Sequence, residues 1–145
     1  MNNRYLYRAK RTDNGEWVEG FLVKKHGLFF IYSVINSDTC GQSNYEVDES
    51  TICQCTGLKD KNGKKIFEGD VVKDSAGVCG EVKFGLYAAG FSIPDTNQGF
   101  YIEFPEESLY RKELGYWENK VVVIGNIYDS PKLLEDKENK HGKDI

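Results

Sequence analysis

Histidine, proline and methionine are scarce in this chain, and long apolar runs are missing. Of the 145 residues only two are His, three are Pro and one is Met. No apolar run approaches the roughly 20 residues that a membrane helix needs. The first residues lead directly into an alternating sequence instead of an apolar secretory segment. We therefore expect a cytoplasmic protein without a membrane partner.

The sequence patterns of several common active sites are also missing. There is no Gly-x-Ser-x-Gly elbow for a nucleophilic serine. No Lys-Ser or Lys-Thr pair follows a glycine-rich loop, as a phosphate-binding loop requires. The two histidines, His26 in an expected turn and His141 in an expected tail, are poorly placed as catalytic bases. These absences predict no catalytic residue and no cofactor.

The four cysteines, Cys40, Cys53, Cys55 and Cys79, allow two interpretations. Without a secretion signal the thiols are expected to stay reduced, and a small buried apolar side chain is their default role. A zinc site formed by the four thiolates is the alternative. The usual Cys-x-x-Cys spacing is absent, however, and no His lies near these residues in the sequence. The sequence therefore predicts reduced cysteines and no metal.

The formal net charge of -4 argues against a protein whose main task is to neutralise phosphates. The charge is uneven along the chain. Residues 1–34 carry six Lys or Arg against three Asp or Glu, whereas residues 84–145 carry seven against eleven. Interspersed charges on solvent-facing strand positions are the common explanation, and a basic face on the first segment stays open.

Aromatic residues and glycines are plentiful, with nine Tyr, eight Phe and 15 Gly. Such a composition favours strands and turns over helices. The first strands expected, with turns between them, are 5–10, 17–24 and 28–35. Residues 1–49 are therefore predicted to form an antiparallel β-meander subdomain, which includes a polar loop over 36–44.

Short strands broken by glycine follow over residues 50–134, a spacing typical of a small barrel. The strands expected here are 51–55, 70–74, 79–84, 90–93, 100–104 and 121–124. Helices are predicted over 105–114, from its initial Pro and first-turn acids, and from Ser130. The fold predicted is mainly β: the meander packs on a small SH3-like, partly open barrel, with one or two short helices near the C-terminus. A charged, disordered tail is expected over 135–145.

The centre of the chain, residues 54–72, holds the strongest local signals. Asn62-Gly63 tolerates positive φ at two successive residues, as a tight hairpin turn requires. In Glu68-Gly69-Asp70 the glycine supplies a conformation barred to other residues, and Asp70 is expected to accept backbone hydrogen bonds that lock a corner. A structural role is favoured for these acids. The alternative is a hydrolase-like enzyme that uses Glu68 and Asp70, with His26, as acid and base.

Over most of its length, from Tyr7 to Leu134, the chain resembles the YopX family of phage and prophage proteins, and two stretches resemble it most strongly. The positions that carry the resemblance are Gln54, Thr56, Gly57, Leu58, Asp60, Gly63, Ile66, Phe67, Glu68, Gly69 and Asp70, followed by Ile124, Gly125, Asn126, Ile127 and Tyr128. Phe67, where Tyr is common, and Asp129-Ser130, where Glu-Asn is common, are departures that should preserve packing. The resemblance implies a mainly β accessory protein in a bacterial host that carries a phage or prophage, and it implies no activity.

Plentiful aromatics, an acidic balance and the lack of a coherent catalytic set favour a small protein-interaction or assembly module. Its partner would be a host or phage protein, or a second copy of the chain. The main alternative is a small barrel that binds single-stranded DNA or RNA, with lysines along the phosphates and aromatics against the bases. By default such aromatics fill a core and such lysines keep a hairpin edge soluble. The binding residues predicted are Lys59, Lys61, Lys64, Lys65 and Tyr87.

Overall fold

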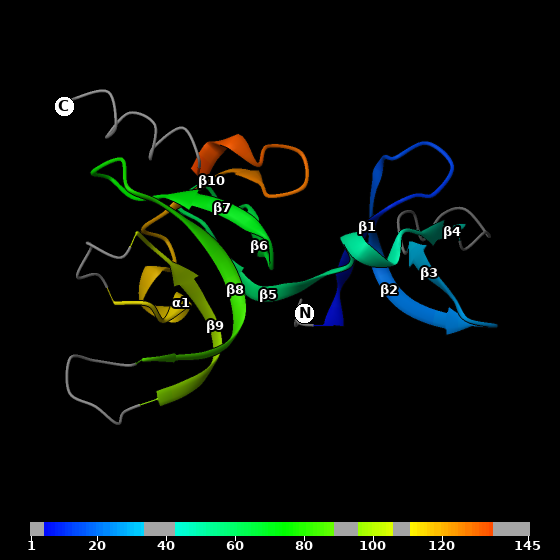
Figure 1. The fold of residues 1–145 in the computed structure, drawn as a ribbon, viewed down its shortest axis with the longest axis horizontal. Helices are drawn as coiled ribbons and strands as arrows, with labels where there is room; N and C mark the ends of the chain where they lie inside the picture. Colours follow the sequence, from blue (N-terminus) through cyan, green and yellow to red (C-terminus); the bar gives the residue numbers. More distant parts are fainter. Residues whose placement is uncertain (1–4, 34–42, 89–95, 106–110, 135–145) are drawn as a thin grey trace. The chain divides into compact units, whose positions relative to one another are not determined.

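The computed structural model describes residues 5–33, 43–88, 96–105 and 111–134. The chain forms two compact units, Met1–Gly57 and Leu58–Ile145 (Figure 1). Antiparallel strands dominate both units, so the prediction of a mainly β protein is confirmed. Within the described ranges no helix is long and apolar enough to cross a bilayer.

The first unit is an antiparallel sheet in the strand order β4-β3-β2-β1-β5. Its strands are β1 (Tyr7–Lys10), β2 (Trp17–Lys25), β3 (Leu28–Ser33), β4 (Ser43–Val47) and the start of β5 (Cys53–Lys59). His26 and Gly27, with φ of 53° and 79°, form the β2–β3 turn. Two successive positive φ values give a turn whose twist matches that of the flanking strands. The predicted meander is therefore present.

The core of the first unit lies on one face of its sheet, because apolar and polar residues alternate along the strands. Ala9 and Ile31 are fully buried at its centre, together with Val47. The sheet bends so that Arg11, just after β1, forms a bridge with Val47 at the end of β4. The Asp48 N–H then donates to the Lys10 carbonyl at 2.8 Å. The short 3-10 helix η2 (Glu49–Thr51) follows this junction.

The second unit contains a four-stranded antiparallel sheet in the order β10-β7-β8-β9, and a hairpin of β5 with β6. Its elements are β6 (Lys65–Phe67), β7 (Asp70–Lys73), β8 (Cys79–Ala88), β9 (Thr96–Glu103), α1 (Leu114–Trp117) and β10 (Val122–Asn126). Over the residues described, the sheet does not close into a barrel. The SH3-like arrangement and the boundary between residues 49 and 50 stay predictions.

Seven buried apolar residues form the core of the second unit. They are Ile66, Val72, Val82, Ile102, Phe104, Leu114 and Val121. Packing is tight at Gly80, where a Cβ would lie 2.5 Å from the Ile102 side chain. Burial of each large apolar side chain is worth about 1.5–3 kcal/mol. The cluster therefore packs the β5–β6 hairpin, the four-stranded sheet and α1 against one another.

The helix predicted over 105–114 is wrong in the described part of that range. The Lys112 carbonyl accepts a hydrogen bond from the Ile102 N–H at 2.8 Å, and Glu113 forms a β-bridge with Tyr101. The chain is thus extended beside β9, and helix α1 begins only at Leu114. Pairing with an edge strand outweighs the helix-like start at Pro105, because propensity is a weak local preference.

Several other expectations fall wholly or largely outside the described residues. These are the strand over 90–93, the charged tail over 135–145 and most of the loop over 36–44, whose last two residues belong to β4. A helical turn at 132–134 follows Pro131, as predicted. With α1, it provides the short helices expected near the C-terminus.

Candidate functional site

The β5–β6 hairpin carries four of the residues predicted to bind a ligand, and one carboxylate shapes its turn. Asp60 is 1% exposed. Its Oδ1 accepts hydrogen bonds from the backbone N–H groups of Asn62 (2.8 Å) and Lys64 (2.9 Å). Gly63 adopts a φ of +83°, a conformation that favours glycine. The lysine side chains on this fixed turn are Lys59, Lys61 and Lys64, which are exposed, and Lys65, which is half-buried.

Asp60 also ties the hairpin to β10. Its Oδ2 accepts a hydrogen bond from the Val123 N–H at 3.0 Å, across 63 residues of sequence. Burial by itself would raise the pKa of Asp60, but the three backbone hydrogen bonds outweigh it and hold the pKa below its ordinary value. Asp60 is therefore an ionised structural acceptor.

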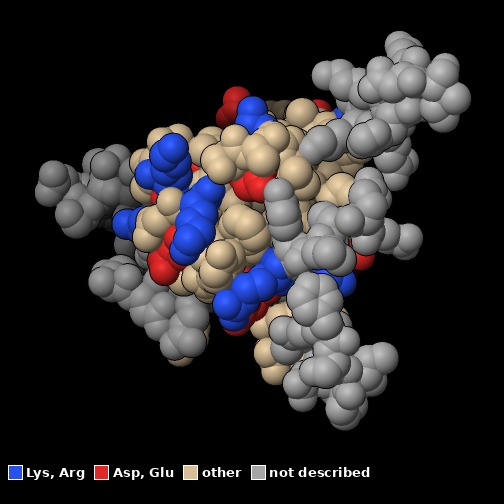
Figure 2. Space-filling model, turned by 90° about the vertical axis from the view of Figure 1, so that its left-hand side faces the viewer, with Lys and Arg blue, Asp and Glu red and all other residues tan. Residues whose placement is uncertain are grey.

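A second cationic segment lies beside this hairpin. The Asn119 N–H donates to the Lys59 carbonyl (3.3 Å), and the Lys61 N–H donates to the Val121 carbonyl (2.8 Å). These bonds place the exposed Lys120 at the same edge of the unit as the hairpin lysines. Figure 2, which looks at the side of the unit that carries α1, shows several Lys and Arg side chains among uncharged surface, with Asp and Glu side chains beside some of them.

Tyr116 organises the cations of this segment. The side chain is 39% exposed, and the Arg111 guanidinium and the Lys120 ammonium each lie 4.7 Å from its ring centre. The Trp117 indole N–H donates to the Arg111 carbonyl at 2.7 Å. Arg111 also forms an ion pair with Glu113. We call the following set the basic patch: Lys59, Lys61, Lys64, Arg111, Lys112, Tyr116 and Lys120.

Tyr87, the fifth residue predicted to bind, contacts a different part of the unit. Its ring stacks on that of Tyr101, with 5.3 Å between the ring centres and 29° between the planes. An ion pair between Lys83 and Glu103 lies on the same face of the β8–β9 hairpin. In the described part of the chain no contact joins Tyr87 to the hairpin lysines. A shared binding role for the five residues stays a prediction.

The opposite face of the β8–β9 hairpin stays apolar where the hairpin extends past the buried core. Val82 is fully buried, whereas Phe84 and Leu86, at the next positions on the same face, are 50% and 70% exposed. Phe84 packs against Phe100 of β9 with 5.0 Å between the ring centres. β9 is an outer strand, and no described strand pairs with its outer edge over 96–100. We call Phe84, Leu86, Phe100 and this edge the apolar arm.

Several motif residues form the corner between β6, β7 and β10. Gly69 has a φ of +88°, and the Oδ2 of Asp70 accepts a hydrogen bond from the Phe67 N–H at 2.8 Å. Asn126 pairs with Asp70 across β7 and β10. The Asn126 Oδ1 accepts two backbone hydrogen bonds from the turn that follows it, each of 2.9 Å. The two stretches of the family-like pattern therefore meet at this corner.

The remaining motif residues lie along β5, the corner and β10. Gln54 pairs with Tyr7 of β1, Thr56 is buried, Gly57 has a φ of +84°, Leu58 packs against the core and Glu68 is half-buried. At Gly125 a Cβ would lie 2.7 Å from the Leu133 side chain, so a larger residue would displace the segment after β10. The hydrolase alternative with Glu68 and Asp70 stays a hypothesis; Asp70 is 1% exposed and bound to backbone.

The described cysteines are buried thiols. They are Cys53, Cys55 and Cys79, whereas Cys40 lies outside the described residues. The Cys53 thiol lies 3.2 Å from the Thr51 carbonyl, as a weak donor would. Within the described ranges, no three His, Cys, Asp or Glu side chains come together as metal ligands would.

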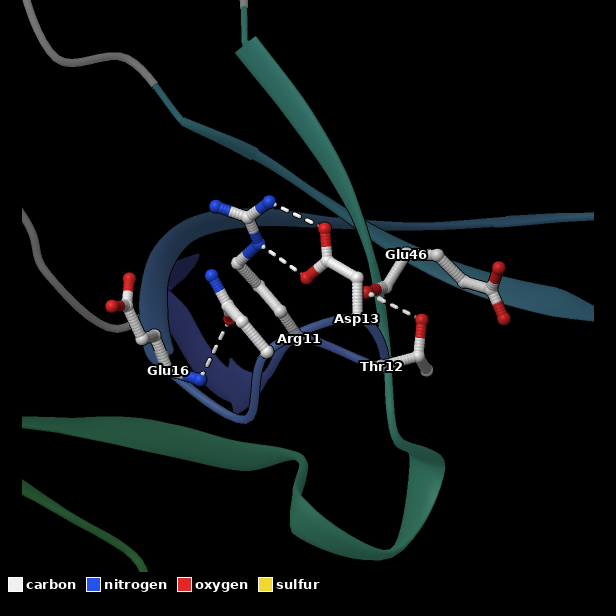
Figure 3. Close-up of polar contacts among 6 residues, drawn as sticks. Arg11, Thr12, Asp13, Glu16 and Glu46 are labelled. Atoms are coloured by element: carbon white, nitrogen blue, oxygen red, sulfur yellow. Dashed lines mark hydrogen bonds and ion pairs between the residues drawn. The ribbon is translucent and has the colours of Figure 1, made fainter.

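A pocket of ≈ 460 Å³ opens in the first unit between the β1–β2 turn and the end of β4. Arg11 donates two hydrogen bonds, of 2.8 and 2.6 Å, to the Asp13 carboxylate (Figure 3). These bonds are the main reason that the pKa of Asp13 lies below its ordinary value. Asp48, also in the lining, accepts from the Ser50 N–H and caps η2. The lining carries both signs of charge and favours no one class of ligand.

Sequence reasoning missed two features of the second unit. Tyr116 and its cations gave no local signal, because their proximity to Lys59 depends on hydrogen bonds across about 60 residues. The apolar arm could have been found, since Phe84 and Leu86 alternate in phase with the buried Val82. The strand was expected to end at Phe84, so Leu86 was not recognised as the next position on the same face.

Comparison with known proteins adds a family assignment. The sequence profile described as YopX protein matches residues 6–135. No curated protein is similar enough to match the chain. A crystal structure of protein EF1440 from Enterococcus faecalis is similar, with 25% sequence identity, coverage of 88% of this chain and 96% of that one, and a TM-score of 0.47. At that score the likeness carries no argument about arrangement. Because the profile spans most of its length, the chain belongs to the YopX protein family.

Proposed function

We propose that this protein is a protein-interaction and assembly module, which pairs with a second copy of itself through the apolar arm. The observation that carries the proposal is the exposure of Phe84 and Leu86 on the face that elsewhere forms the core. Burial of such side chains against a partner is worth about 1.5–3 kcal/mol each. The phage or prophage setting that the family resemblance implies is part of the same proposal.

The edge of β9 supports association by strand addition. The Ile102 N–H donates away from β8, to Lys112, so the backbone groups of Gln98 and Phe100, in the same phase, also point outward. Residues 96–100 read Thr-Asn-Gln-Gly-Phe and contain neither charge nor proline, the features that usually protect an edge strand. An added strand would satisfy these outward N–H and C=O groups.

A second copy is the occupant that fits this edge best. An uncharged strand can pair antiparallel with its own copy about a two-fold axis without opposing like charges. The same pairing brings Phe84 and Leu86 of both copies to one face of the extended sheet, because residues in phase share a face. The contact closes on itself, so it would give a dimer and not a filament.

Light scattering coupled to size-exclusion chromatography tests the proposal on the full chain at micromolar concentration. We expect a dimer for the native chain and monomers for Leu86→Glu, which charges the apolar face, and for Gln98→Pro. Proline at Gln98 removes an outward N–H and leaves the pairing with β8 intact. The matched control is Asn97→Glu, which puts the same charge on the other face of the hairpin and should stay dimeric.

Circular dichroism establishes that each variant is folded. A native chain that stays monomeric up to millimolar concentration would refute the proposal. Dimers of unchanged stability in both Leu86→Glu and Gln98→Pro would refute it too, because association would then use another surface.

A further inference from the structure

We infer that the basic patch is a second binding site, and that its ligand is single-stranded nucleic acid. Residues 59–64 and 111–121 together hold six Lys or Arg against three Asp or Glu, although the whole chain has a net charge of -4. A local excess of cations attracts phosphates whatever the charge of the remaining surface. The inference goes beyond the proposed dimer and does not depend on it.

The three carboxylates within these segments leave most of the lysines without a counter-charge. Asp60 is buried, and both of its oxygens accept backbone hydrogen bonds. Glu113 pairs with Arg111, and Glu118 is half-buried. In the described part of the chain, no ion pair joins a carboxylate to Lys59, Lys61, Lys64 or Lys112, all exposed, although the buried Asp60 attracts Lys64. The fifth exposed lysine of the patch, Lys120, is held at Tyr116 by the ring and the carbonyl of that residue. Four ammonium groups are thus available for phosphates.

The backbone that carries the patch is held in place before any ligand arrives. Asp60 fixes the β5–β6 turn and ties it to Val123 of β10. The bond from Asn119 to Lys59 fixes the next segment against the hairpin, and the Ile102 N–H fixes Lys112 against β9. A preorganised set of cations loses less freedom on binding, so more of the electrostatic attraction appears as affinity.

The planar groups among these cations favour single-stranded nucleic acid over other anionic ligands. Tyr116 is 39% exposed, and the planar guanidinium of Arg111 lies over its ring. Unpaired bases stack on aromatic rings and on guanidinium planes, whereas a duplex keeps its base faces inside the helix. An acidic peptide would meet only the charges and would leave these planes unused.

Fluorescence anisotropy of a labelled thymidine oligomer tests the inference on the full chain. An oligomer of about 16 nucleotides covers the site size of a small nucleic-acid-binding domain. Each single-strand phosphate contact contributes about 0.7 to the slope of log affinity against log salt. Contacts from the four available lysines therefore predict that affinity falls on the order of 50-fold between ~50 and ~200 mM salt.

Two double variants with the same change in net charge test whether binding depends on the basic patch or on the charge of the whole chain. Lys61→Ala with Lys64→Ala should lower the salt slope by about 1.4. The matched control, Lys24→Ala with Lys25→Ala on β2 of the first unit, changes the net charge equally and should leave the slope unchanged. Tyr116→Leu should weaken binding about tenfold with little change in slope, because it removes stacking and no charge.

Three results would overturn the inference. The first is the absence of salt-dependent binding, and the second is an equal loss in the Lys24 and Lys25 control. The third is displacement of the oligomer by poly-glutamate as effectively, per charge, as by unlabelled oligomer, which would show an acidic-protein surface. Leu86→Glu should keep full oligomer affinity, so failure of the dimer proposal and failure of this one give different results.

Discussion

Replacing Asp60 by asparagine tests whether one carboxylate locks the β5–β6 hairpin to β10. The two oxygens of Asp60 accept three backbone hydrogen bonds, from Asn62, Lys64 and Val123. Asparagine keeps the shape but has only one acceptor oxygen, so its NH2 group must face at least one of these N–H donors. A buried donor left unpaired costs about 1–3 kcal/mol, and a lost hydrogen bond to a charged group about 1.5–3 kcal/mol. We expect Asp60→Asn to lower the free energy of unfolding by about 2–4 kcal/mol.

Asp74 provides a matched control because its turn has the same shape. Its Oδ1 accepts hydrogen bonds from the N–H groups of Ala76 (3.0 Å) and Val78 (2.8 Å). Gly77 has a φ of +88°, close to that of Gly63. The single oxygen of an asparagine can accept both of these bonds, so Asp74→Asn is expected to cost no more than about 0.5 kcal/mol.

The same pair of variants gives a pH signature. The folded-state pKa of Asp60 lies below its ordinary value of 3.8, so the ionised carboxylate stabilises the fold. That contribution is fully present above the ordinary pKa and is lost as the pH falls through the lower folded pKa. The stability difference between the native chain and Asp60→Asn should therefore be constant near neutral pH and narrow below about pH 4.

Urea unfolding followed by circular dichroism measures these differences at each pH. Equal losses in Asp60→Asn and Asp74→Asn would refute the reasoning, because the bond to Val123 would then contribute nothing. A difference that does not narrow in acid would refute the assignment of an ionised acceptor.

Two further predictions concern close packing and a half-buried charge. In Gly20→Ala the new Cβ would lie 2.1 Å from the Tyr32 carbonyl oxygen, so β2 and β3 must separate, and we expect a loss of about 3 kcal/mol in thermal unfolding. The control Gly115→Ala meets nothing within 4 Å and should be neutral or stabilising, and a neutral Gly20→Ala would show that the strands are not in contact there. Burial raises the pKa of Glu81 in spite of the opposing charge of Lys83, so its ionised form destabilises the fold at neutral pH. Glu81→Gln should therefore raise the free energy of unfolding at pH 7, with the gain vanishing below the ordinary pKa of 4.5, and a gain that persists at pH 3 would contradict this cause.

Turns are the features that sequence reasoning recovered best, because their causes lie within a few residues. The Asn62-Gly63 pair predicts the β5–β6 hairpin, which is present. The expected positive φ at both residues is wrong for Asn62: only Gly63 adopts one, because the turn runs from Asp60 to Lys64 and is closed by the Asp60 N–H on the Lys64 carbonyl. The Glu68-Gly69-Asp70 run predicts a corner held by the carboxylate, and Asp70 accepts the Phe67 N–H at 2.8 Å. In both cases an acid and a glycine within one turn determine the backbone path, so no knowledge of distant residues is needed.

Element ends were harder to predict, because tertiary pairing determines them. β8 continues to Ala88, past the expected end at Phe84, since β9 pairs with it as far as Thr96. The segment before α1 is extended for the same kind of reason: its backbone bonds to the edge of β9. Local patterns at these places indicate the end of a strand or the start of a helix, but pairing with the neighbouring strand keeps the backbone extended.

The charge of the chain illustrates a limit of composition arguments. A net charge of -4 predicts a protein that avoids phosphates, but net charge averages over surfaces that a ligand never contacts together. The lysines predicted to bind lie together on the β5–β6 hairpin, and their binding role stays a prediction. Lys120 and Arg111 join them only through bonds between distant segments. The Tyr87 that was grouped with them packs on Tyr101 instead.

Most of the residues that identify the family have a structural role in the fold. The side-chain oxygens of Asp60, Asp70 and Asn126 accept backbone hydrogen bonds, and Gly125 leaves room for Leu133. A side chain that holds its own backbone is not available to recognise a partner without loosening the structure. The surfaces that we propose for binding, by contrast, depend on residues outside that pattern or on lysines between its positions. We therefore expect that relatives that share the corner need not share a partner, because the corner specifies the scaffold and the exposed positions specify what it binds.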